Sequence, residues 1–139
     1  MAMMNRRMRT LAALAALGLA SAATAAIPVR TPLRVVPIAP QKKVDRVETT
    51  RVDFLPGQAM PEHKHNVPVV CFVTKGAFLV SIGADPVRSV AVGDVTLEPA
   101  SAIVHYFRNA SGVEPAQLLC ASLAGDEDKV LNVMLSPAQ

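Results

Sequence analysis

From Val44 onward the chain consists of short apolar and β-branched segments, separated by turn residues at intervals of about ten. Glycine or proline marks most of these breaks, as at Pro56-Gly57, Lys75-Gly76 and Gly93-Asp94. Strand-length segments with this punctuation are typical of an all-β sandwich or barrel. The expected strands are 44–54, 67–74, 77–82, 87–92, 95–97, 102–108, 116–123 and 129–135.

Composition agrees with a single β domain and excludes one class of partner. A chain of 139 residues suits one domain, and its eleven prolines argue against a helical bundle. The formal charge of +3 depends on Arg6, Arg7 and Arg9. Without them 11 Lys and Arg stand against 11 Asp and Glu. The rest of the chain therefore lacks the positive charge expected of a nucleic-acid binder.

Residues 1–25 have the pattern of a secretory signal peptide. A positive start precedes the 11-residue apolar run 10–20, and small residues suited to cleavage follow near positions 22–26. A membrane span needs about 20 apolar residues, so no stable span is expected. The pattern predicts a periplasmic or secreted protein. Export through the Sec pathway is favoured, and Arg6-Arg7 leaves a twin-arginine signal as the alternative.

Residues 26–43 form the next distinct segment, with prolines at 28, 32, 37 and 40. This spacing favours an extended arm without internal hydrogen bonds. The arm is either a flexible tether or a strand-like cover for a sheet edge, which would make a homodimer if that edge belonged to a second copy. The β domain proper is then 44–139.

Three histidines occur in the chain, namely His63, His65 and His105. The first two are i and i+2, so on a strand both point to one face. His105 would join them from a strand across the interior. Three neutral imidazoles suit a divalent ion (Fe, Mn, Ni, Cu or Zn) and leave positions open for water or substrate. The alternative is that these are ordinary surface or core histidines.

The spacing of these histidines resembles the two motifs of the cupin superfamily. The matching residues are Gly57, His63, His65 and Gly76 for the first motif, and Gly93, Pro99, His105 and Asn109 for the second. The resemblance implies a small jelly-roll barrel, the double-stranded β-helix, with all three histidines as metal ligands.

The sequence departs from the family pattern at several positions. The family's glutamate ligand would fall at Val69 or Val70, Ser101 replaces a glycine, and one extra residue precedes His105. The resemblance then implies a three-histidine site, as in cupin thiol and diketone dioxygenases. Loss of the carboxylate raises the charge of the site and favours a small organic anion as ligand.

Further residues are expected to line the pocket around the metal. If Val69 faces the interior, so do Cys71 and Val73, and the face of His105 carries Phe107 and Asn109. Cys71 has three alternatives: a small buried residue, a disulfide partner of Cys120, or a thiolate ligand. Glu62 is expected at the rim.

Three functions remain open at this point. The first is a metal-dependent, dioxygenase-like oxidoreductase that acts on a small organic anion. The second is a non-catalytic cupin that binds or senses a metal or small ligand. The third is a metal-free structural barrel, since a fold does not fix a function.

Overall fold

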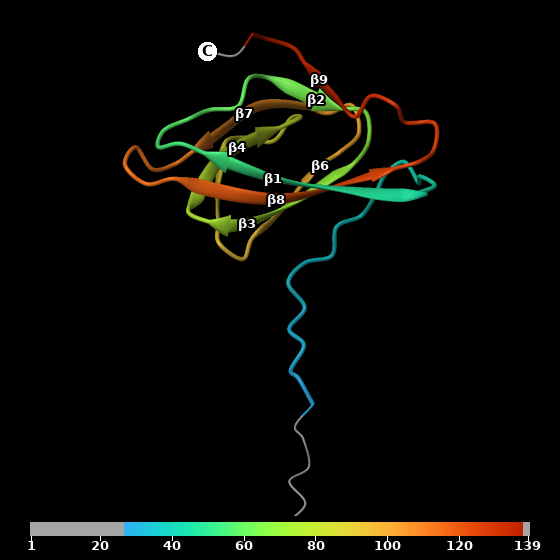
Figure 1. The fold of residues 1–139 in the computed structure, drawn as a ribbon, viewed down its shortest axis with the longest axis horizontal. Helices are drawn as coiled ribbons and strands as arrows, with labels where there is room; N and C mark the ends of the chain where they lie inside the picture. The colour runs from blue at the N-terminus through green and yellow to red at the C-terminus, as the bar shows by residue number, and fades with distance from the viewer. Residues whose placement is uncertain (1–26, 138–139) are drawn as a thin grey trace, which may run out of the picture. The chain divides into compact units, whose positions relative to one another are not determined.

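The computed structural model describes residues 27–137, in which two antiparallel sheets pack face to face (Figure 1). The predicted signal peptide lies outside the described residues. One sheet has the strand order β1-β8-β3-β6 and the other β5-β4-β7-β2-β9. The strands are β1 (Arg46–Phe54), β2 (His63–His65), β3 (Val69–Lys75), β4 (Ala77–Ile82), β5 (Arg88–Ala91), β6 (Val95–Glu98), β7 (Ile103–Asn109), β8 (Ala116–Ala124) and β9 (Asn132–Met134).

The prediction of an all-β jelly roll is confirmed, and each of the eight expected segments overlaps a strand. Strand order differs from chain order because most successive strands lie in different sheets, as in a double-stranded β-helix. Along β4 the side chains alternate between buried and half-buried positions, as expected where one face covers a core. Within residues 27–137, no helix is long and apolar enough to cross a membrane.

The interior has an aromatic end and a polar end. Phe54, Phe78 and Phe107 meet at the aromatic end, where the ring centroids of Phe54 and Phe78 are 5.0 Å apart. Their edge-on contact is a favourable arrangement of aromatic rings and fills the space between the sheets. The other end carries the candidate metal site. The aromatic packing therefore lies next to that site.

Residues 27–45, the described part of the chain before β1, contain neither helix nor strand. Ile27–Arg30, the first described residues, have exposed side chains. Further along, the Arg34 guanidinium donates a hydrogen bond to the Val95 carbonyl, with an Nη1–O distance of 3.2 Å. Pro37 and Ile38 share a surface hollow with Leu97. Residues 34–38 thus lie beside β6 of their own chain, the outermost strand of the first sheet.

Cys71 and Cys120 form a disulfide between neighbouring strands. The two residues are directly opposite each other on β3 and β8, and their Cα atoms are 4.0 Å apart. Cys71 is almost fully buried, whereas Cys120 is half-buried. Of the alternatives for Cys71, the structure contains the disulfide.

Gly76, in the turn between β3 and β4, gives a test of the fold. Its φ is +72°, and a Cβ built there would lie 2.9 Å from the Cβ of Ala116. Gly76→Ala should therefore lower the free energy of unfolding by about 2 kcal/mol or more, measured by urea denaturation. Gly112→Ala is the control, because its added Cβ meets nothing within 4 Å. Equal losses for the two variants would contradict this account of the turn.

Candidate metal centre

Two histidines of β2 point into the barrel. His63 and His65 are 5% and 9% exposed, and Lys64 between them faces the other way. The imidazole rings meet edge to face with centroids 5.1 Å apart. β2 lies between β7 and β9, so both of its edges are paired and the rings are held in place. The shared face of the two rings is the one predicted from the H-x-H spacing.

In each ring Nδ1 makes a hydrogen bond to an oxygen that can only accept one. His63 Nδ1 donates to the Pro61 carbonyl at 2.7 Å, and His65 Nδ1 donates to Asn132 Oδ1 at 2.5 Å. With the proton on Nδ1, a neutral ring presents the lone pair of Nε2 to the interior. Metal-binding histidines are commonly oriented in this way.

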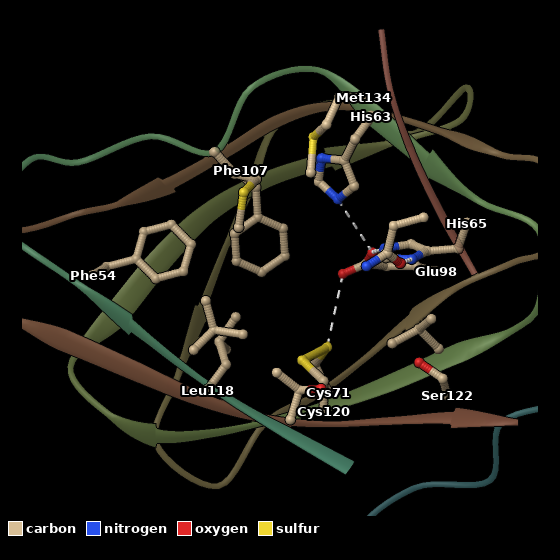
Figure 2. Close-up of a pocket in the computed structure, with 15 residues that line it drawn as sticks. Phe54, His63, His65, Cys71, Glu98, Phe107, Leu118, Cys120, Ser122 and Met134 are labelled. Carbon is tan, nitrogen blue, oxygen red and sulfur yellow. Dashed lines mark hydrogen bonds and ion pairs between the residues drawn. A yellow bond between two sulfur atoms is a disulfide. The ribbon is translucent and has the colours of Figure 1, made fainter. Parts of the chain in front are cut away.

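Glu98 reaches the same point from the opposite sheet. Its side chain is almost fully buried, and its Oε2 is 2.6 Å from His65 Nε2 and 3.7 Å from His63 Nε2 (Figure 2). The donor atoms of the three residues all lie within 4.8 Å of one another. The short contact lacks hydrogen-bond geometry, so Oε2 is a buried oxygen without a donor. Facing lone pairs at this distance require a cation between them, either a proton or a metal ion.

The pKa values of the site report the same preference for positive charge. Burial alone would lower the pKa of His63, but the contact with Glu98 and the bond to the Pro61 carbonyl leave that pKa raised. Burial alone would raise the pKa of Glu98, yet the two imidazoles leave that pKa lowered. Two imidazoles and one carboxylate are a common ligand set for Fe(II), and each donor type also binds zinc. These residues therefore fit a divalent ion.

The structure corrects one predicted ligand, His105, which does not lie with the other two histidines. Along β7 and β4, Tyr106 pairs with Ser81, but Val104 pairs with Ile82, so His105 is an extra bulged residue. Val104 takes the inward position and is buried. An extra residue turns the following side chain to the other face, and this is why the three-histidine site is wrong.

His105 instead belongs to a surface pair. Its Nδ1 lies 2.9 Å from Glu62 Oε2, and its side chain is 46% exposed. Glu62 thus lies at the surface, where the sequence placed it. Exposed pairs of this kind contribute little to stability.

Glu98 is the candidate ligand that sequence reasoning missed. It lies directly opposite Val69, the position at which the cupin motif would carry its glutamate. The carboxylate is therefore supplied by the neighbouring strand. One signal existed, because strand alternation in 95–98 puts Thr96 and Glu98 on one face. Because Pro99 follows directly, however, the sequence pattern assigns Glu98 to a turn.

The ligands lie in a cavity of about 110 Å³ between the sheets. Val69, Cys71 and Phe107 line it, whereas Val73 packs with the aromatic end of the core. Asn109 is buried outside the cavity and fixes a turn, where its Nδ2 donates to the Leu55 and Glu114 carbonyls. Exposed lining residues mark the opening of the cavity, and they are Thr50, Asn132 and Met134.

With this geometry established, comparison with known proteins gives the family. The model of the cupin domain matches residues 50–122, more than half of the chain. The chain therefore belongs to the cupin family. No curated protein sequence matches it.

Solved structures show the same fold at low sequence identity. Oxalate oxidase in complex with the substrate analogue glycolate is 24% identical, with a TM-score of 0.54 over 64% of this chain and 46% of that one. Oxalate decarboxylase from Bacillus subtilis is 17% identical, with a TM-score of 0.55 over 64% and 24%. A double-stranded β-helix protein from Klebsiella pneumoniae is 16% identical, with a TM-score of 0.54 over 66% and 76%. The match thus spans less than half of the oxalate oxidase chain.

Substitution of the ligands tests the corrected site. Glu98→Ala and His65→Ala should each weaken zinc binding by roughly 100-fold or more, because loss of an outer-shell partner alone costs about 10- to 100-fold. His105→Ala is the matched control and should leave the affinity unchanged. Isothermal titration of the metal-free proteins with zinc measures all three. Loss of binding in the His105 variant, with binding kept in the Glu98 variant, would refute the assignment.

The pKa shifts predict how the stability of the metal-free protein depends on pH. The proton on His63 stabilises the fold below its ordinary pKa of 6.5, and this contribution is lost as pH rises through the raised folded value. The contribution of Glu98 is present above 4.5 and is lost as pH falls through its lowered pKa. In the presence of a chelator, Tm should therefore fall from about pH 6 to about pH 8.

Scanning calorimetry at several pH values, with His63→Gln as the non-titrating control, measures this dependence. In the His63→Gln control, Tm should fall much less with rising pH than in the wild type. Zinc should raise Tm more at the higher pH, where it no longer competes with the proton. A Tm of the metal-free wild type that rises over this interval would contradict the prediction.

Proposed function

We propose that this cupin is a metal-dependent oxidoreductase that oxidises a small organic anion with dioxygen, and that iron(II) is the ion held by His63, His65 and Glu98. The observation that carries the proposal is the convergence of two imidazoles and one carboxylate on one buried point. That ligand set, with open positions, is the one found in non-haem Fe(II) oxygenases.

The charge of the site supports an anionic substrate. One carboxylate and two neutral imidazoles leave a divalent ion with a net charge of +1. Much of the cavity wall is apolar, with Phe54, Val69 and Leu118 among its residues, so this charge is poorly screened by water. The cavity of about 110 Å³ suits a molecule of a few heavy atoms.

The residues around the site favour oxidation over acid–base chemistry. Among the described residues that line the cavity, His63, His65 and Glu98 are the ones with titratable side chains, since Cys71 and Cys120 are joined in a disulfide. A bound metal supplies Lewis acidity and electron transfer. The chain itself orients the candidate ligands through Pro61 and Asn132, and its apolar wall reduces their contact with water.

The same scarcity of acid–base residues also favours a second candidate, a cupin that binds a metal or small ligand without turnover. The ligand substitutions would then abolish binding, and no reaction would accompany binding in the wild type. Metal content alone does not separate the two candidates, so a measurement of turnover is needed.

Oxygen uptake by the iron-loaded protein separates the candidates. We expect consumption of dioxygen with at least one member of a panel of glycolate, oxalate, small thiols, diketones and flavonols. Glu98→Ala should lower the rate by roughly 100-fold or more, and His105→Ala should leave it unchanged. An iron-loaded wild type that binds these anions and consumes no dioxygen would favour the non-catalytic candidate.

We also propose that the protein is exported and that residues 1–25 are removed. The Cys71–Cys120 disulfide supports an oxidising compartment, where such bonds persist. Intact-mass measurement of the protein from the periplasm and medium of a bacterial host should give a chain that begins near residues 22–26. A full-length chain confined to the cytoplasm would contradict export.

A further inference from the structure

The Cys71–Cys120 disulfide borders the metal site directly. Cys71 Sγ lies 3.8 Å from Glu98 Oε1, while Glu98 Oε2 faces the two imidazoles. Figure 2 shows the carboxylate between the ring of His63 on one side and the disulfide on the other. A disulfide sulfur carries no hydrogen, so this contact is not a hydrogen bond, and the sulfur is a poor ligand while it is oxidised.

Reduction of this disulfide would place a strong soft donor beside the Glu98 carboxylate that meets the imidazoles. We propose, building on the metal site described above, that reduction creates a second ligand set in which the Cys71 thiolate binds the ion together with His63 and His65. In the oxidised protein the ion is held by the imidazoles and Glu98. In the reduced protein the site selects thiophilic ions such as zinc, because thiolate is the softer ligand.

A second, independent feature supports a thiolate at this position. Thr96 lies directly opposite Cys71 across β3 and β6, is fully buried, and its hydroxyl has no hydrogen-bond partner. Opposite residues of this kind have Cβ atoms about 5 Å apart. A buried hydroxyl without a partner is costly, and a thiolate at Cys71 would give it an acceptor.

The cavity already contains other sulfur atoms. Met60 and Met134 line it, and Met134 lies opposite His63 across the pair of β2 and β9. Thioethers are soft donors, so the surroundings also favour a thiophilic ion.

The reduction step follows from the burial of the two sulfurs. Cys71 is 1% exposed, whereas Cys120 is half-buried and pairs with the exposed Thr50 at the opening. A thiolate of an external dithiol attacks Cys120 Sγ, the Cys71–Cys120 bond breaks, and its electron pair leaves on Cys71 Sγ. The second thiol of the reductant then releases Cys120 as a thiol. The dithiol is oxidised to a disulfide, and the protein gains two electrons and two protons; binding of the ion displaces the proton of Cys71.

Zinc binding and reduction of the disulfide should therefore favour each other. A thiolate beside the Glu98 carboxylate would put two buried negative charges together, which is costly unless a cation lies between them. Zinc should then bind roughly 10-fold or more tightly to the reduced protein, a coupling within the usual range for two linked sites. By reciprocity zinc should raise the midpoint potential of the disulfide by about 30 mV for each such tenfold gain.

Cobalt(II) titration of the full mature protein tests the proposal, because a thiolate ligand gives a charge-transfer band in the near ultraviolet. We expect the band in the reduced wild type and in Cys120→Ser, and not in the oxidised wild type or in Cys71→Ser treated with the same reductant. Competition with zinc gives the affinities, and a dithiol redox titration with and without zinc gives the midpoint shift.

Each outcome of this experiment decides a point. Cobalt bound equally in both redox states without the band would overturn the second ligand set and leave the imidazole–carboxylate site intact. Binding of no cobalt in any form would overturn both that site and this proposal. If Cys120→Ser fails to fold, the redox titration of the wild type decides. A reduced wild type that unfolds even with zinc present would also overturn the proposal.

Discussion

A buried carboxylate that faces two imidazoles governs the polar end of this barrel. Glu98 is 3% exposed, and removal of a charge from water to such a place costs several kcal/mol unless an opposite charge accompanies it. His63 and His65 are the groups that meet it, one sheet across. Their arrangement is stable with a cation in the centre and strained without one. The proposed function therefore depends on which cation occupies this place.

Much of the packing in the rest of the barrel lies outside this polar end. The three phenylalanines fill the opposite end, and the disulfide joins β3 to β8 in the sheet that carries Glu98. The orientation of the histidines depends on short local bonds to Pro61 and Asn132. A rigid frame of this kind can hold metal ligands in an open, reactive geometry, and it allows Cys71 to serve both as a structural link and as a latent donor.

Much of the fold was predictable because its signals are local. Gly and Pro breaks, such as Gly76 with its positive φ, mark where strands end, and β-branched runs mark where they lie. The shared face of His63 and His65 followed from the period of two along a strand. Each of these inferences needs only a few neighbouring residues and no knowledge of which strands pair.

The two errors at the site are the prediction of His105 as a ligand and the omission of Glu98. Both have one cause, because the direction of each side chain depends on pairing between distant strands. One added residue in β7 forms a bulge against β4, and this turns His105 outward in favour of Val104. The sequence shows the extra residue, but it does not show which residue of β7 then faces the interior. Likewise Glu98 replaces the missing motif glutamate only because β6 pairs with β3 so that it lies opposite Val69. Periodicity along one strand carries no information about that register.

The most direct test of the central claim is anomalous diffraction from crystals of the zinc-loaded protein. The account predicts one strong peak inside the barrel, about 2.0–2.2 Å from His63 Nε2, His65 Nε2 and a Glu98 carboxylate oxygen. A peak at His105 and Glu62, with none between the two sheets, would contradict it.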